Sequence, residues 1–159
     1  MLGLAACSTS SVTSPGQTEA VPVDTATLPT TGTVGEGRFP TAEVAVGDTE
    51  LRVWVADDSA ERGQGLRRVE ELPPEVDGML FVWDTPTSAV FVMEDTLIPL
   101  DVWFFDDEGE LLGTHEMTPC TDEPCPTYPA PGPVRWALET RLGDQNFVEG
   151  DRLSTSPSG

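Results

Sequence analysis

The chain has 159 residues, enough for one domain of ordinary size, and a net charge of −20. Its 28 acidic residues are opposed by only eight basic residues, all of them arginine. A surface this acidic repels phosphate backbones and anionic lipid headgroups, so we expect no nucleic-acid partner. Contact with a membrane would then depend on a lipid anchor alone.

The amino-terminal part of the chain, up to residue 38, is rich in Ser, Thr, Pro and Gly and poor in large apolar residues. Such a composition cannot bury enough apolar surface to offset the entropy lost on ordering. We therefore expect a disordered tether over residues 8–38, a single folded domain over 39–154 and a disordered tail over 155–159.

Residues 1–7, M-L-G-L-A-A-C, resemble the end of a bacterial lipoprotein signal. In this interpretation Cys7 carries the lipid and anchors the domain to the extracytoplasmic face of the cell membrane. Only six residues precede Cys7, whereas a signal peptide needs an apolar stretch of about 7–15 residues. We therefore expect a truncated signal whose true start lies upstream. The alternative is a cytoplasmic protein with a disordered start.

Apolar and polar residues alternate over residues 42–47 and again over 50–56, and G-D-T at 47–49 is typical of a turn. This pattern predicts an antiparallel hairpin with one face toward a core.

The D-D-S sequence at 57–59 offers helix caps, and residues 60–68 predict a short helix that contains two glycines. After an irregular proline-containing segment, the apolar run G-M-L-F-V-W at 78–83 predicts a strand that is buried on both faces or closed into a barrel. Pro86 is expected to end that strand.

The stretch at 89–101, A-V-F-V-M-E-D-T-L-I-P-L-D, is the segment around which we expect the fold to be arranged. Its apolar residues 90–93 predict a buried strand, and the polar E-D-T that follows predicts a turn before a second strand near Asp101. This geometry would place several oxygen-bearing side chains at the rim of a sheet. The alternative is that Asp95 and Thr96 only cap the turn through hydrogen bonds to the backbone.

Residues 101–105 and 110–116 predict two strands joined by the acidic turn D-D-E-G at 106–109. An acidic turn suggests calcium, but the helix-loop-helix calcium loop needs oxygen ligands at alternate positions before its glycine. Phe104 and Phe105 occupy the positions where those ligands would begin, so a hairpin turn is favoured and we expect no metal.

The proline-rich segment 117–133 contains Cys120 and Cys125. Their spacing allows a small closed loop, and an exported protein meets an oxidising compartment, so we predict a disulfide between them. Zinc binding is the alternative. Zinc usually takes four ligands, and His115 is the single histidine of the chain, so carboxylates would have to complete the site.

Residues 134–139, V-R-W-A-L-E, predict a further strand with its first, third and fifth residues on one face. Residues 140–147 predict a helical turn, and 149–153 are expected to close the domain.

Several of these segments, in this order, resemble domain of unknown function family 192, a widespread prokaryotic group. The segments are R-G-Q-G-L at 62–66, G-M-L-F-V at 78–82, Met93 with T-L-I-P-L-D at 96–101, P-C-T-D-E-P-C-P-T-Y at 119–128 and G-D-R at 150–152. The resemblance extends over about residues 42–153. It implies a mainly β domain, compact, antiparallel and barrel-like or sandwich-like, with one or two short helices and often exported. It implies no activity.

Three positions depart from the family pattern. Family members commonly have Trp, Lys and Asn around the central methionine, where this chain has Val92, Glu94 and Asp95. Glu94 reverses the charge of the lysine, so an anion-binding role at that position does not carry over to this chain.

The sequence contains no strong catalytic signature. There is no G-x-S-x-G elbow for a serine nucleophile and no glycine-rich phosphate loop, and paired or lipidated cysteines cannot supply a thiolate. The weak catalytic candidates are the carboxylate of Asp101 and the imidazole of His115, which can exchange a proton near pH 7. A lone histidine on an alternating strand is more often structural.

These residues lead to two functional hypotheses, with a purely structural envelope protein as a third. The first is a binding or accessory module for a small ligand, cation, glycan or envelope partner, with an acidic rim made of Met93, Glu94, Asp95, Thr96, Asp101 and Tyr128. The same carboxylates could instead be an ordinary solvated surface. The second hypothesis is an enzyme that uses Asp101 with His115. We expect a monomer that needs no cofactor.

Overall fold

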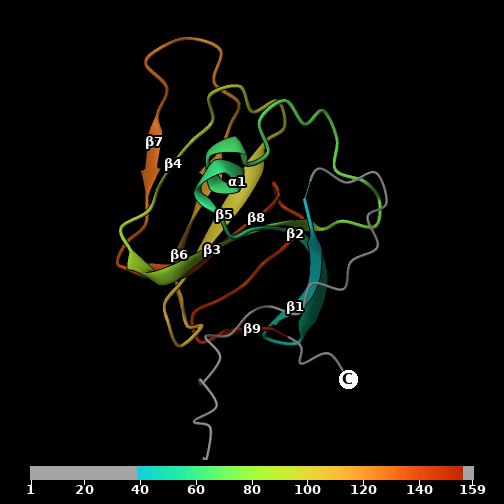
Figure 1. Cartoon of the computed structure of the whole chain (residues 1–159), viewed down its shortest axis with the longest axis vertical. Coiled ribbons are helices and arrows are strands. Elements are labelled where there is room, and N and C mark those ends of the chain that lie inside the picture. Colours follow the sequence, from blue (N-terminus) through green and yellow to red (C-terminus); the bar gives the residue numbers. More distant parts are fainter. Residues whose placement is uncertain (1–38, 156–159) are drawn as a thin grey trace, which may run out of the picture.

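The computed structural model describes residues 39–155, which form one short helix and nine strands (Figure 1). The elements are β1 (Thr41–Val46), β2 (Thr49–Ala56), α1 (Ser59–Gln64), β3 (Gly78–Thr87), β4 (Val90–Val92), β5 (Leu100–Phe105), β6 (Leu111–Met117), β7 (Thr127–Pro129), β8 (Val134–Arg141) and β9 (Leu153–Thr155). Cys7, the tether and residues 156–159 lie outside the described residues. Within the described part, no helix is long and apolar enough to cross a membrane.

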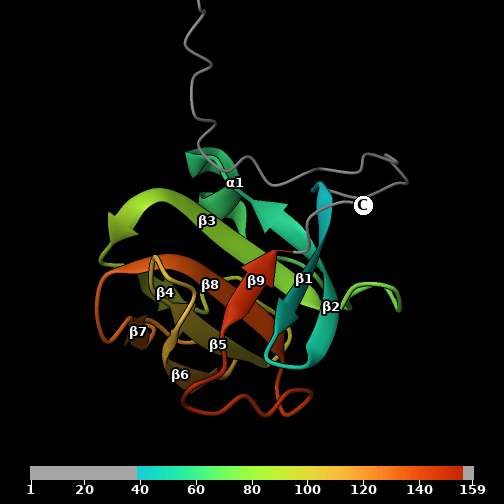
Figure 2. The same cartoon turned by 90° about the horizontal axis from the view of Figure 1, so that it is seen from below.

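Seven strands form one curled sheet in the order β6-β5-β8-β3-β2-β1-β9, and β4 and β7 form a separate two-stranded sheet. The two ends of the large sheet approach each other. The backbone N–H of Leu153 donates to the carbonyl of Gly109 at 2.8 Å, and a β-bridge joins Glu110 to Arg152. The large sheet is therefore a half-barrel, and its curl is visible from below in Figure 2. The predicted mainly β, barrel-like fold is confirmed.

One pair of neighbouring strands is parallel: β2 pairs with β3, so the chain must cross over between them. The crossover consists of α1 and an irregular segment at 65–77. Asp58 begins α1 by accepting hydrogen bonds from the N–H groups of Ala60 and Glu61, both at 2.8 Å. Gly65 ends the helix with a φ of +48°, a conformation that favours glycine.

Both faces of the curled sheet are buried, which creates two apolar cores. The inner core lies inside the curl, because it joins residues from distant strands such as Val44 of β1 and Phe105 of β5. The outer core lies between the sheet and the crossover, and it includes Leu72 of the crossover with Met79 and Phe104 of the sheet. Central strands are therefore apolar on both sides, as the run at 78–83 predicted.

The strand predicted at 90–93 is not buried in the large sheet. Val90 and Val92 of β4 are 59% and 38% exposed, and only Phe91 and Met93 pack against the outer core. The reason is that β4 belongs to the narrow two-stranded sheet, where it pairs with β7 and leaves one face to solvent.

Pro86 does not end β3, which continues to Thr87. The pairing of β3 with β8 is irregular between Val82 and Thr87, so the missing N–H of a proline there removes no ladder hydrogen bond.

The prediction of a helical turn at 140–147 was wrong. Strand β8 continues to Arg141, and the chain then turns at Gly143, whose φ is +79°. The first residue of β8 also departs from the expected face, because Val134 packs in the outer core while Trp136 packs against the inner one. The same irregularity in the pairing with β3 accounts for this change.

The acidic residues at 106–109 form the predicted hairpin turn between β5 and β6. The carboxylate of Asp106 accepts hydrogen bonds from the N–H groups of Glu108 at 2.9 Å and Glu110 at 2.8 Å. This carboxylate therefore orders the turn through the backbone.

The predicted disulfide between Cys120 and Cys125 is present, with the two Cα atoms 5.7 Å apart. It closes the loop that precedes β7. A parallel β-bridge between Glu94 and Cys120 joins this loop to the segment that follows β4.

Replacing both Cys120 and Cys125 with serine should lower the free energy of unfolding by about 2 kcal/mol, because the link restricts the unfolded chain over a short loop. Urea unfolding of the variant and of the unmodified protein measures the difference, and Cys7→Ser serves as the control. An unchanged midpoint in the double variant would contradict the prediction.

Candidate functional site

A cavity of about 390 Å³ lies between α1, the outer face of the large sheet and strand β4. In Figure 1, α1 lies in front of the large sheet and β4 passes beside it. The residues of this cavity that matter most for its chemistry are Arg62, Arg67, Phe81, Trp83, Phe91 and Glu139.

Glu139 lies on strand β8, in the middle of the sheet. It pairs with Met79 of β3 on one side and with Val102 of β5 on the other. Directly paired residues of antiparallel strands share a face of the sheet. The Glu139 side chain therefore lies on the outer face between two side chains that are 0% exposed, and Glu139 itself is 5% exposed.

Within residues 39–155, the Glu139 carboxyl group forms no hydrogen bond or ion pair with another residue, and its oxygens open onto the cavity. Burial alone raises the pKa of the Glu139 carboxyl from its usual 4.5 to about 8. The group is therefore mainly protonated and neutral at pH 7.

Arg62, near the end of α1, also lines the cavity, but it is engaged inside the protein. Its Nη1 atom donates to the backbone carbonyls of Asp57 and of Val82, the latter at 2.7 Å. Its guanidinium lies 5.7 Å from the centre of the Trp83 ring. These contacts join α1 to β3 beside the cavity.

Aromatic rings form the apolar part of the cavity. The rings of Phe81 and Trp83 are stacked with centres 6.4 Å apart, and Phe91 meets Phe81 edge-on at 5.0 Å. Since Phe91 comes from β4 and the other two rings from β3, the cavity is bounded on two sides by aromatic surface.

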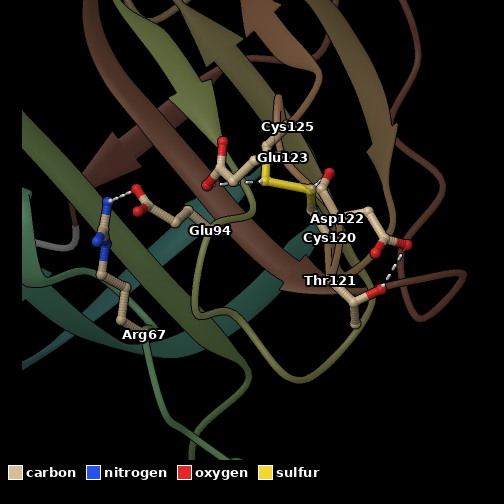
Figure 3. Close-up of a disulfide and its surroundings, with 7 residues drawn as sticks. All are labelled: Arg67, Glu94, Cys120, Thr121, Asp122, Glu123 and Cys125. Atoms are coloured by element: carbon tan, nitrogen blue, oxygen red, sulfur yellow. Dashed lines mark hydrogen bonds and ion pairs between the residues drawn. A yellow bond between two sulfur atoms is a disulfide. The ribbon is translucent and has the colours of Figure 1, made fainter.

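Ion pairs join the turn after α1 to the turn after β4. Arg67 donates to Glu94 at 3.2 Å, and Figure 3 shows these two side chains pointing toward one another beside the disulfide loop. Arg68 pairs with Asp95 at 3.5 Å, and its backbone N–H donates to the Asp95 carbonyl at 2.8 Å. Glu94 and Asp95 are each about half exposed, so solvent weakens both ion pairs.

The six residues predicted for an acidic rim do not form one site. Met93 is 0% exposed and belongs to the outer core. Asp101 is 5% exposed and accepts a hydrogen bond from the N–H of Gly143 at 2.8 Å, so it holds the turn after β8. Of the six, only Thr96 lines the cavity.

Asp101 and His115 are on opposite faces of the large sheet. His115 of β6 pairs directly with Val102, so it shares the face of Val102, whereas Asp101 precedes Val102 in β5 and points the other way. The structure therefore does not bring together the two groups of the predicted acid–base pair. The Nε2 atom of His115 lies 3.0 Å from the Pro129 carbonyl oxygen, and its ring lies 5.9 Å from that of Tyr128.

Glu139 was not among the residues singled out by sequence, where it is only the last residue of a predicted strand. The available signal is that a glutamate follows V-R-W-A-L in a strand, on the face opposite to Trp136 and Leu138. Recognising its burial requires knowing that β8 lies between β3 and β5, and local sequence does not give that order.

The chain belongs to domain of unknown function family 192, described as "Uncharacterized ACR", whose model matches residues 42–155. The resemblance noted from sequence is thereby confirmed, although the family description gives no activity. No curated protein matches the chain significantly.

Solved structures that resemble this fold include the following two. A proposed transcription regulator from Sinorhizobium meliloti 1021 is 26% identical, with a TM-score of 0.65 over 76% of this chain and 98% of its own. A protein of unknown function from Novosphingobium aromaticivorans DSM 12444 is 28% identical, with a TM-score of 0.61 over 73% of this chain and 86% of its own. Most of each relative therefore corresponds to the domain described here.

The raised pKa of Glu139 makes its contribution to stability depend on pH. Between about pH 4.5 and pH 8 the unfolded chain has released a proton that the folded protein retains. Proton binding by Glu139 favours the folded protein over the unfolded chain. This contribution to the free energy of unfolding is fully present below pH 4.5 and is lost as the pH rises to about 8.

Glu139→Gln, which does not titrate, should gain stability relative to the unmodified protein as the pH rises. The gain between pH 4 and pH 8 should be on the order of 3–5 kcal/mol. Chemical unfolding of both proteins across this range measures it, and comparing the two removes the effects of all other titrating groups. A stability difference that stays constant with pH would contradict the burial of an unpaired carboxyl group.

Proposed function

We propose that this protein is a binding module for a small ligand, and that the ligand binds in the cavity over Glu139. The observation that carries the proposal is a carboxyl group that is buried, faces a cavity and has no partner within the described residues. Ligand sites are typically concave and mainly apolar, with a few polar groups that fix the orientation of the ligand. The aromatic rings supply the apolar part of this cavity, and Glu139, Arg62 and Arg67 are among the polar residues that line it.

The stability of the domain gives a reason to assign a function to Glu139. A buried carboxyl group without a partner destabilises a fold, whereas an apolar residue between Met79 and Val102 would not. Groups that are perturbed in this way and face a cavity are concentrated at functional sites. This cost argues against a purely structural role for the position.

The alternative functions have less support. An enzyme based on Asp101 and His115 would need both groups at one reacting atom, and they lie on opposite faces of the sheet. A role in transcription, proposed for the Sinorhizobium relative, would bring DNA close to a chain of net charge −20, which repels phosphate.

The proposal can be tested by closing the cavity. Ser88 is exposed and lines the cavity, so Ser88→Trp should obstruct it. We expect members of a fragment library to bind in ligand-observed NMR and to lose binding to Ser88→Trp. Thr114→Trp is the matched control, because Thr114 is also exposed and lies on β6, which contributes no residue to the lining of the cavity. Absence of binding, or binding that Ser88→Trp leaves unchanged, would contradict the proposal.

We also propose that the module acts outside the cytoplasm, held at the cell membrane by a lipid on Cys7. The lipobox-like sequence supports this location, and so does the disulfide, which persists in oxidising compartments. Metabolic labelling with a fatty-acid analogue in a bacterial host should mark the full-length gene product and should not mark its Cys7→Ser variant. An unlabelled, soluble product would contradict the anchor.

A further inference from the structure

We infer that the ligand is an organic cation, whose ammonium or guanidinium group pairs with the Glu139 carboxylate while its apolar part lies against Phe81, Trp83 and Phe91. This inference rests on the proposed function, since it assigns the chemical class of the ligand for the same cavity. A volume of about 390 Å³ suits a small amine with one ring or a short chain.

The cations of the cavity are already engaged inside the protein. Arg62 donates to two backbone carbonyls and covers Trp83, and Arg67 is paired with Glu94. Within the described residues neither arginine forms an ion pair with Glu139, and Arg67 has a further interaction besides the one with Glu94. An anionic ligand would have to displace one of these contacts, whereas a cationic ligand would meet the carboxyl that has no partner.

The surroundings of Glu139 also favour a cationic ligand. On the sheet it is flanked by the apolar Met79 and Val102. His115 lies one strand further on, beyond Val102, and does not line the cavity. The charged groups that face the same cavity from the described elements are Arg62 and Arg67. Among the described residues that line the cavity, Glu139 is the only acidic one, so a cation placed among the rings would find its counter-ion there once the carboxyl releases its proton.

The long-range electrostatic field of the protein also favours a cationic ligand. A chain with a net charge of −20 attracts cations and repels anions before any contact is made. Anionic ligands would approach this cavity against the field of the whole molecule, while a cationic ligand is steered toward it.

Binding of a cation requires Glu139 to release its proton, so affinity should depend on pH in a defined direction. Since the pKa of the free carboxyl is about 8, few molecules are competent at pH 6 and about half at pH 8. The affinity for an amine should therefore rise roughly 50-fold from pH 6 to pH 8 and then level off until the amine itself loses its proton near pH 10.

Three probes with the same aromatic body but different charge test the inference: 2-phenylethylamine, 2-phenylethanol and 3-phenylpropanoate. Each is titrated by NMR or calorimetry into the unmodified protein, Glu139→Gln and Ser88→Trp at pH 6 and pH 8. We expect the amine to bind most tightly, with the stated rise in affinity with pH. In Glu139→Gln the amine should lose at least about tenfold in affinity at pH 8 and the pH dependence should disappear.

The outcomes separate this inference from the proposed function. If the alcohol or the carboxylate binds in the cavity as well as or better than the amine, the cavity is a ligand site but not one for cations. Amine binding that is unchanged in Glu139→Gln would overturn the inference in the same way. If none of the probes binds while library fragments still bind in the cavity, only the inference fails; if neither binds, the proposed function fails with it. Since Gln has nearly the shape of Glu and should stabilise the fold at pH 8, the variant remains folded under the conditions of the test.

Discussion

The burial of both faces of the central strands is the constraint on which the rest of this structure depends. Strand β8 lies between β3 and β5, with the inner core on one face and the crossover on the other. Residues in the middle of its outer face must therefore be accommodated away from bulk water. Ala137 is apolar and is readily buried there, whereas Glu139 is buried as a neutral acid beside a cavity. The position of that one carboxyl gives the domain its candidate function.

Several arginines join the elements that surround or support this cavity. Arg62 joins α1 to β3, Arg67 joins the turn after α1 to the turn after β4, and Arg141 donates to the Leu72 carbonyl at 3.0 Å and so fastens the crossover to the end of β8. The disulfide loop is attached to the same region through the bridge at Glu94. These arginines therefore hold the elements of the site together. The buried carboxyl and the aromatic rings are the groups that remain to bind a ligand.

Local sequence predicted the elements better than it predicted their arrangement. Alternation gave the β1–β2 hairpin, turn chemistry gave the β5–β6 hairpin, and cysteine spacing gave the disulfide, because each depends on residues close in sequence. The exposure of β4 and the separation of Asp101 from His115 depend on strand order and register, which are set by distant pairings. For the same reason the sequence predicted a site at the acidic residues near Asp95. It predicted none at Glu139, which is an ordinary glutamate at the end of an apolar run.

The titration of Glu139 is the measurement that tests this account most directly. Selective ¹³C labelling of glutamate allows the side-chain carboxyl carbon of Glu139 to be followed by NMR from pH 4 to pH 10, with Glu139→Gln identifying its signal. The account predicts a midpoint near pH 8, because the carboxyl is buried without a partner. A midpoint near the ordinary value of 4.5 would show that the group is solvated or paired, and the cavity would then lose the property that marks it as a site.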